Sequence, residues 1–337
     1  WLALWLASKG AVVRGYALDP ETQPSLFEAA RVREHVEDIR GDIRDSARLE
    51  PAMRDFAPDV VFHMAAQPLV RASYADPIGT FETNIIGTAR LLDAVRRTPS
   101  VHAVVSVTTD KCYENREWLW AYRESDPLGG YDPYSSSKAC AELVTAAYRQ
   151  SYFPVAKLAE HHCAIATGRA GNVIGGGDWS TDRLIPDLIR GFISKNPVTI
   201  RSPHAIRPWQ HVLEPLHGYL QLAEKLLTGD PRYATAFNFG PFDDDTRPVG
   251  WIADRLVALW GDSAGWIHEA DATAHEANYL KLDASRARAE LGWRPRLRLS
   301  QALDWVVDWY RASQGGADLE RITLEQIAAY ESLPAVE

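Results

Sequence analysis

The chain has 337 residues, a hydrophobic content of 46% and a formal net charge of -9 at pH 7. This length and composition suffice for a large globular core, or for a nucleotide-binding domain with a smaller lobe. The acidic balance and the absence of long Lys/Arg runs exclude a general nucleic-acid binder, which needs a basic face.

The cysteines, the histidines and the apolar stretches indicate the location of the protein and the kinds of site that it can have. Cys112, Cys140 and Cys163 have neither metal-ligand spacing nor the even count of a disulfide framework. His161 and His162 have no further ligand at metal spacing. No uninterrupted apolar stretch reaches the roughly 20 residues that a membrane helix needs. We therefore expect a cytoplasmic protein with reduced thiols, no metal site and no membrane partner.

The first predicted element is a helix over residues 1–9, which ends at Gly10 and leads directly into a strand. Short β-branched runs and longer amphipathic stretches then alternate up to about residue 170, which is typical of a parallel sheet covered by helices. The predicted strands are 11–18, 36–39, 59–65, 103–108 and 162–167. The predicted helices between them are 46–56, 78–98 and 133–152.

After Gly168 the segments are punctuated by Gly and Pro. The predicted helices there are 182–195, 211–228, 247–260 and 300–312. The whole pattern predicts an α/β fold, a Rossmann-type doubly wound parallel sheet with a smaller C-terminal substrate-binding lobe. Residues 1–170 would form the dinucleotide-binding domain, and residues 171–337 mainly the lobe, interleaved with the last sheet strands.

The start of the chain departs from that fold. In a dinucleotide-binding domain a strand and a glycine-rich loop precede the first helix, because the loop and the helix N-terminus hold the pyrophosphate. The helix predicted for residues 1–9 has neither before it, and the chain begins with Trp1 instead of Met. We expect the first strand and the glycine-rich loop to be absent, so that this domain is incomplete at its N-terminal side.

A polar triplet ends the strand predicted for residues 103–108. Thr109, Asp110 and Lys111 follow the apolar run, although strand ends are often wet and a polar ending alone has an ordinary structural explanation. Folds of this class bind their ligands at the carboxyl ends of parallel strands. The triplet therefore becomes a candidate site when other reactive groups lie near it.

The strongest local signal is a Tyr-x-x-x-Lys pattern at the start of the helix predicted for 133–152. Tyr134 and Lys138 are four residues apart, which places the phenol and the ammonium on one helix face. A nearby ammonium stabilises phenolate, so we expect the pKa of Tyr134 to fall from about 10 toward a value useful for a general base.

These segments together resemble the extended short-chain dehydrogenase/reductase family over nearly the whole chain. Tyr134 and Lys138 match the family's catalytic Tyr and Lys. The triplet 109–111 stands where nucleotide-sugar 4,6-dehydratases carry their acid/base residues. The run Thr-Thr-Asp-Lys-Cys-Tyr-Glu-Asn at 108–115 and the run Gly-Asn-Val-Ile-Gly-Gly-Gly-Asp-Trp at 171–179 look like the CDP-glucose 4,6-dehydratase branch.

The resemblance implies NAD as a retained cofactor. Asp19 matches the family's ribose-binding acid, Asp42 and Ile43 match its adenine-side pair, and residues 63–67 match the strand end beside the nicotinamide. Asn84 matches the family's helix Asn. The implied cofactor-binding residues are Asp19, Asp42, Ile43, Ala65, Ala66, Gln67, Asn84, Tyr134 and Lys138.

The implied reaction is the oxidation, dehydration and reduction of CDP-glucose to CDP-4-keto-6-deoxyglucose, a lyase reaction of deoxysugar biosynthesis. Tyr134, helped by Lys138, would take the proton of the sugar 4-hydroxyl, which Thr109 would also hydrogen-bond. The resulting ketone acidifies the C5 proton, and Asp110 would protonate the departing 6-hydroxyl. Hydride would then return to C6, which regenerates NAD.

Lys111 departs from most of that group, which has Glu at this position for C5 proton abstraction. A lysine can act as a base only if burial or a neighbouring cation depresses its pKa. Alternatively, its ammonium stabilises the enolate while another group moves the proton. We expect Lys111 to take part in the elimination and leave these two roles open.

The resemblance also implies how the substrate is held. Arg207 matches the arginine that meets the nucleotide diphosphate, where a guanidinium suits phosphate oxygens. Asn172 and Asn238 match amide contacts in the same region, and Arg201 is a further phosphate candidate. We expect a nucleotide-sugar substrate, no nucleic-acid partner, and a homo-oligomer that is either a dimer or a tetramer.

Two other functions fit part of the pattern. A nucleotide-sugar 4-epimerase on the same fold shares Tyr134 and Lys138 but does not need Asp110 and Lys111. A nucleotide-sugar-binding protein without turnover is the alternative from another class, because the glycine-rich loop is missing from the sequence.

Overall fold

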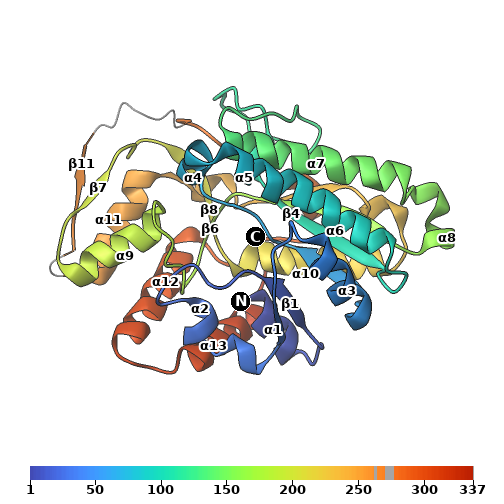
Figure 1. Cartoon of the computed structure of the whole chain (residues 1–337). Helices are drawn as coiled ribbons and strands as arrows, with labels where there is room; N and C mark the ends of the chain where they lie inside the picture. The colour runs from blue at the N-terminus through green and yellow to red at the C-terminus, as the bar shows by residue number, and fades with distance from the viewer. Residues whose placement is uncertain (262–263, 270–276, 337) are drawn as a thin grey trace.

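The computed structural model describes residues 1–261, 264–269 and 277–336 (Figure 1). The elements up to residue 170 are α1 (Leu2–Ser8), β1 (Arg14–Ala17), α2 (Leu26–Ala29), η1 (Val32–Glu34), β2 (Glu37–Arg40), α3 (Ser46–Phe56), β3 (Val60–His63), α4 (Val70–Ala75), α5 (Pro77–Phe81), η2 (Glu82–Ile86), α6 (Gly87–Arg96), β4 (Ala103–Thr109), η3 (Asp110–Cys112), α7 (Pro133–Ser151), η4 (Val155–Lys157), α8 (Leu158–His161) and β5 (Ala164–Ala170).

The elements that follow are β6 (Asn172–Ile174), α9 (Leu184–Ser194), β7 (Val198–Ile200), β8 (Ile206–His211), α10 (Leu213–Leu227), η5 (Pro231–Tyr233), β9 (Ala236–Phe239), η6 (Asp243–Asp245), β10 (Thr246–Pro248), α11 (Val249–Trp260), β11 (Trp266–His268), η7 (Ala287–Leu291), α12 (Leu299–Gln314) and α13 (Leu319–Ser332). The segments η2 and η7 are π-helical turns, and the other η segments are 3-10 helices.

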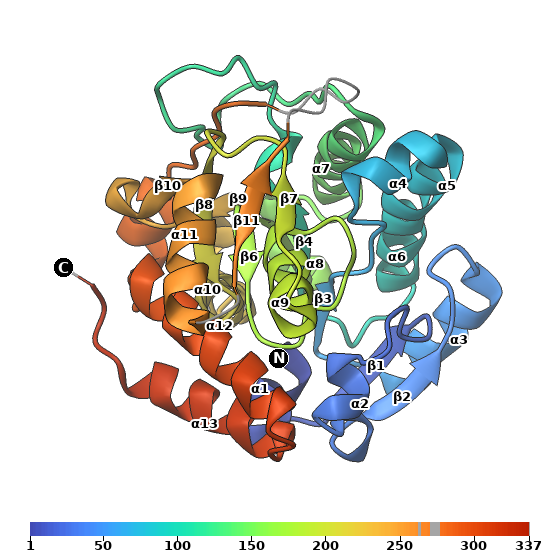
Figure 2. The same ribbon diagram turned by 90° about the vertical axis from the view of Figure 1, so that its left-hand side faces the viewer.

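The predicted α/β fold with parallel strands is confirmed. The main sheet has the order β3–β4–β5–β9, with every neighbouring pair parallel. A second parallel pair, β1–β2, lies beside α2 and α3 (Figure 2). Within the described part of the chain, no strand of the β1–β2 pair is hydrogen-bonded to a strand of the main sheet. Because parallel strands end at one edge, the residues after β3, β4 and β5 converge.

Alternation along β4 and β5 explains why helices cover both faces of the main sheet. Val104 and Ile165 pack in one core with α6, whereas Ala103, Val105 and Ala166 pack in another with α10. Figure 1 shows α6 and α7 on one side of β4, with α10 on the other. This two-sided burial fixes the position of the polar residues that follow β4.

The second half of the chain contributes to the main sheet and also builds smaller sheets. The strand β9 pairs with β5, while β10–β8–β6 and β11–β7 form two separate small sheets. A core of α9, α11 and α12 residues supports them, including the fully buried Trp309. Among the described residues, no helix is both long and apolar enough to cross a membrane.

Helix boundaries follow from local chemistry. The predicted helix 46–56 matches α3, in which the Asp45 side chain accepts from the backbone N–H of Ala47 and Arg48. In α7, Pro133 occupies the first turn and the Asp132 side chain accepts from the Ser135 N–H. The prediction of one helix over 78–98 was wrong in detail, since α5, η2 and α6 share this range with a π turn between them.

A buried carboxyl ties α10 to the C-terminal helix. Glu214 Oε1 accepts from the backbone N–H of Arg296 at 2.9 Å and of Leu297 at 2.7 Å, and Tyr330 Oη donates to Oε2 at 2.8 Å. Burial raises the pKa of Glu214 to about 7. Folding therefore favours the protonated acid, and this stabilising contribution is lost as the pH rises from about 4.5 through about 7.

Glu214→Gln should isolate that effect, because glutamine mimics the protonated acid at every pH. Between about pH 5 and about pH 8, the free energy of unfolding of the wild type should fall by about 3 kcal/mol relative to the variant. Denaturant unfolding of both proteins at each pH measures this difference. A difference that does not change with pH would contradict the assignment.

Candidate active site

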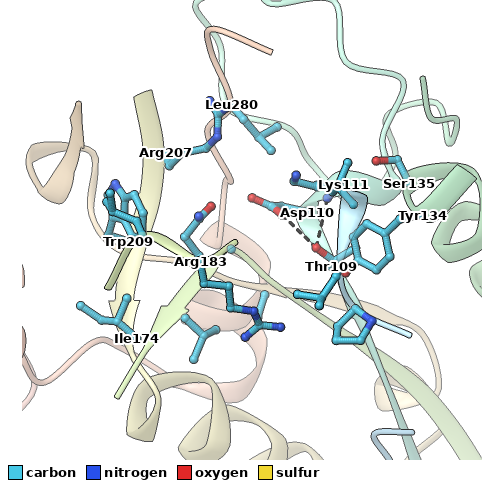
Figure 3. A pocket seen from close by; sticks show the side chains of 18 of the residues that line it. Thr109, Asp110, Lys111, Tyr134, Ser135, Ile174, Arg183, Arg207, Trp209 and Leu280 are labelled. Atoms are coloured by element: carbon cyan, nitrogen blue, oxygen red, sulfur yellow. Dashed lines mark hydrogen bonds between the residues drawn. The ribbon is translucent and has the colours of Figure 1, made fainter. Parts of the chain in front are cut away.

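A cavity of about 880 Å³ opens where β4, β5 and β8 meet the start of α7 (Figure 3). The polar triplet, which begins with the last residue of β4, the first turns of α7 and the segment after β5 form part of its wall. The predicted residues that line it are Ala66, Thr109, Asp110, Lys111, Tyr134, Lys138, Asn172, Arg201 and Arg207. Residues far apart in the sequence therefore share one cavity.

Asp110 lies in the wall of this cavity and is almost completely buried. Thr109 Oγ1 donates to Asp110 Oδ1 at 3.0 Å and accepts from the Lys111 backbone N–H at 3.3 Å. Asp110 Oδ2 has no hydrogen-bond partner in the described part of the protein. Burial raises the pKa of Asp110, and the charge of Lys111 is the strongest influence against that rise. The carboxyl group is thus suited to hold a proton and to deliver it into the cavity.

Tyr134 stands opposite the triplet, at the start of α7. Its backbone N–H donates to Ser73 Oγ at 3.1 Å, which fixes the helix start against α4. Burial raises the pKa of Tyr134 to about 12, while the Thr109 hydroxyl and the charge of Arg183 act against the rise. The prediction of a lowered pKa is therefore wrong for the protein without ligands, because the loss of hydration outweighs the nearby charges.

Lys138 follows Tyr134 by one helical turn and is also buried. Its Nζ donates to the Val107 carbonyl at 3.4 Å. Burial lowers the pKa of Lys138 to about 8, and the carboxylate of Glu142 acts against this change. An ammonium has three N–H donors. In the described residues one of them has a hydrogen-bond acceptor, so the others can serve a ligand in the cavity.

The residues predicted to bind the far end of the cofactor lie outside this cavity. The Asp19 side chain, just beyond β1, is 86% exposed and lies 3.6 Å from Arg40 Nε. Asp42, just beyond β2, is held by Arg44, whose guanidinium lowers the pKa of Asp42. Ile43 is buried in the core with α6. Asp19, Asp42 and Ile43 therefore lie at the carboxyl ends of β1 and β2, as the triplet lies at the carboxyl end of β4.

Gln67 and Asn84 hold the segment after β3 in place. Asn84 Oδ1 accepts from the Gln67 N–H at 2.8 Å, and Asn84 Nδ2 donates to the Gln67 carbonyl at 3.0 Å. The same Nδ2 donates to Ser137 Oγ at 2.8 Å, which ties this segment to α7. Ala65 precedes Ala66 in that segment and is half-buried. In this structure Asn84 therefore hydrogen-bonds other protein residues and fixes the segment after β3 against α7.

The donor and acceptor chemistry fits a nicotinamide dinucleotide. The exposed carboxylate of Asp19 can accept from ribose hydroxyls, and the buried ammonium of Lys138 can donate to them. Ala66 lies in the cavity wall, as Lys138 does.

The four predicted substrate residues do not share one role. Arg207 is buried in the cavity wall and donates to the carbonyls of Ile206 at 2.9 Å and Ala277 at 2.5 Å. Asn172 and Arg201 also line the cavity. These residues can reach a bound ligand without a change of fold.

Asn238 does not line the cavity, and the prediction that it contacts substrate does not fit its position. It is fully buried in β9, where Nδ2 donates to the carbonyls of Tyr122 and Asp283, both at 3.0 Å. Its Oδ1 accepts from Tyr113 Oη at 2.7 Å. Both ends of the amide thus hold protein groups, so the residue is structural.

Arg183 is a cavity residue that sequence reasoning missed. Figure 3 shows its side chain between Tyr134 on one side and Trp209 on the other. One guanidinium nitrogen lies 3.2 Å from Asp178 Oδ2. Arg183 directly precedes α9, whereas the helix predicted for 182–195 would include it, so no signal in the sequence pointed to it.

The chain is similar to known nucleotide-sugar 4,6-dehydratases. The family model described as GDP-mannose 4,6 dehydratase matches residues 1–305. A CDP-glucose 4,6-dehydratase of Salmonella typhimurium is 51% identical over 332 residues, which cover 98% of this chain and 92% of that protein. A dTDP-glucose 4,6-dehydratase of Streptomyces antibioticus is 29% identical over 277 residues, covering 81% and 76% respectively.

Two solved structures have folds similar to that of this chain. The dTDP-glucose 4,6-dehydratase of Streptomyces venezuelae, solved with NAD bound, is 25% identical with a TM-score of 0.69, covering 85% of this chain and 83% of that one. A UDP-glucose 4-epimerase of Thermotoga maritima, 19% identical, has a TM-score of 0.79 with 93% and 95% covered. At that identity the epimerase shows the fold alone.

Proposed function

The chain belongs to the GDP-mannose 4,6-dehydratase family, and we propose that it converts CDP-glucose into CDP-4-keto-6-deoxyglucose with NAD as cofactor. The observation that carries this proposal is that Asp110 and Lys111 share a cavity with Tyr134 and Lys138. Such a site can join an oxidation to an elimination. The 51% identical CDP-glucose 4,6-dehydratase supports the choice of nucleotide.

In the oxidation step, Tyr134 removes the proton from the sugar 4-hydroxyl. When bound, the cofactor would supply a hydride acceptor and a positive charge that would lower the pKa of a nearby phenol. Thr109 Oγ1 hydrogen-bonds the same hydroxyl and orients it toward Tyr134. Lys138 would hold a ribose hydroxyl of the cofactor with its remaining donors.

In the elimination step, the C5 proton and the 6-hydroxyl leave the sugar as water. Asp110 protonates the departing hydroxyl, since burial raises the pKa of its carboxyl and so favours the protonated form. Lys111, whose charge acts directly on Asp110, faces the same cavity. Lys111 then either removes the C5 proton or stabilises the enolate that its removal leaves.

Lys111→Met should separate elimination from oxidation. We expect a loss of about 10²-fold or more in the rate of C5 proton exchange with solvent, while C4 oxidation persists. Lys111→Arg distinguishes the two roles, because arginine keeps the charge but cannot act as a base. Retained exchange in the Arg variant assigns electrostatic stabilisation, and its loss assigns the base. Full activity of the Met variant would exclude both.

The arginines of the cavity wall are placed to hold the nucleotide diphosphate. Arg207, Arg201 and Arg183 bring three guanidinium groups to the wall that faces Tyr134. Guanidinium groups pair with phosphate oxygens in a bidentate manner. Asn172, in β6, also lines the cavity and can hydrogen-bond the sugar or the phosphate.

We also propose an oligomeric state, a location in the cell and a division into domains. Exposed apolar side chains on α5, η2 and α7, namely Ile78, Ile86 and Leu143, support a homo-oligomeric contact, a dimer or a tetramer. We also propose a cytoplasmic location. Residues 1–170 would act as the cofactor domain, and residues 171–337 mainly as the nucleotide-sugar lobe.

The reaction run in D₂O tests dehydration against epimerisation. A dehydratase exchanges the C5 proton with solvent, so its product should carry deuterium at C5. A 4-epimerase returns hydride to C4 and leaves C5 untouched, and a binding protein gives no product at all. NMR of the product therefore decides between the three functions. Product with the C5 proton fully retained would contradict the proposal.

A further inference from the structure

Glu142 is a buried carboxylate outside the cavity wall, and it holds four hydrogen bonds. Oε1 accepts from Thr108 Oγ1 at 2.5 Å and from Arg169 Nε at 2.9 Å. Oε2 accepts from Thr167 Oγ1 at 2.8 Å and from an Arg169 terminal nitrogen at 2.9 Å. Three elements therefore meet at one side chain, namely α7, β4 and β5.

Arg169 extends this contact toward the segment that follows the triplet. Its other terminal nitrogen donates to Tyr113 Oη at 2.8 Å and to the Glu124 carbonyl at 3.3 Å. The guanidinium also lies 5.0 Å from the centre of the Tyr113 ring. Glu142 and Arg169 are 4% and 5% exposed in their side chains, so the pair is shielded from water and salt.

The residues around Glu142 adjoin the reactive groups along the chain. Thr108 directly precedes the triplet, and Glu142 follows Lys138 by one turn of the same helix. The hydrogen bond from Thr108 to Glu142 thus joins the strand that carries Asp110 to the helix that carries Tyr134. An unpaired carboxylate would be costly at this depth, and the complete set of donors explains how it is tolerated.

We propose that Glu142 is a positioning residue for the reaction: its carboxylate fastens α7 to the ends of β4 and β5 and keeps Lys138 protonated in the cavity. This inference rests on the proposed function only in assigning Lys138 to the active site. The titratable groups that face Lys138 are Glu142 on α7, Cys112 on η3 and His63 on β3. Glu142 is the strongest charge that favours the ammonium, against the effect of burial.

The test measures the protonation of Lys138 itself. Acetic anhydride acylates only neutral amines, so the pH dependence of Lys138 acetylation, read on its peptide by mass spectrometry, gives the midpoint of its titration. In the wild type we expect a midpoint near 8. The double variant Glu142→Gln/Arg169→Gln removes both charges without leaving either one unpaired. Its midpoint should lie at least about one pH unit lower.

Glu142→Asp is the matched control, because it keeps the charge but shortens the side chain. Its Lys138 midpoint should stay at the wild-type value, while kcat falls since the link to β4 is lost. A wild-type midpoint in the double variant would overturn the charge role, and a wild-type kcat in Glu142→Asp would overturn the positioning role. The acetylation needs no substrate, so it stands even if the proposed substrate is wrong.

Discussion

Tyr134→Phe should lower kcat for CDP-glucose by about 10²- to 10⁴-fold, the usual contribution of a positioned acid or base. The phenol oxygen is the group that takes the 4-hydroxyl proton, and phenylalanine fills the same buried space without it. Because oxidation comes first, the variant should form no reduced cofactor when substrate is added. Absorbance of reduced nicotinamide in a rapid-mixing experiment measures this directly.

Tyr152→Phe serves as the control for that experiment. Tyr152 lies at the far end of α7, half-exposed, and is not among the residues that line the cavity. The same change of one hydroxyl there should leave kcat at the wild-type value. Wild-type turnover in Tyr134→Phe would remove this residue from the reaction.

Asp110→Asn should also lower kcat by about 10²- to 10⁴-fold, but with a different signature. Asparagine has the same shape and can still accept from Thr109 Oγ1, yet it has no acidic proton to give. Oxidation at C4 precedes the step that fails, so reduced cofactor should accumulate. The same absorbance measurement therefore shows a signal in this variant that Tyr134→Phe lacks.

The double variant Tyr134→Phe/Asp110→Asn tests the order of the two steps. If oxidation precedes elimination, it should show no reduced cofactor, as Tyr134→Phe does. Reduced cofactor in the double variant, or normal product formation in Asp110→Asn alone, would contradict the assigned roles.

The sequence predicts those parts of the fold in which local signals and burial agree. The strand β4 is apolar on both faces and was placed correctly, and α3 has a capping Asp45 before it. The π turn η2 was not predictable from helical periodicity, although it places Asn84 against Gln67. The strands after β5 were missed, including the six-residue β8, and the others have only three or four residues, too few to show alternation.

The site was predictable only as far as the order of strands and helices brings residues together. Asp110 and Tyr134 share a cavity because β4 and α7 are neighbours in a parallel sheet fold. The pKa of Tyr134 was predicted with the wrong sign, since the depth of burial cannot be read from spacing. Nothing in the sequence around Asn238 indicated that its side-chain amide hydrogen-bonds three protein groups.

The mass of the product formed from CDP-glucose is the most direct test of the central claim. The wild-type protein with NAD should yield a nucleotide sugar lighter than the substrate by one water molecule, and it should turn over CDP-glucose faster than dTDP-glucose. A product of unchanged mass would instead identify an epimerase, and an unaltered substrate would contradict catalysis altogether.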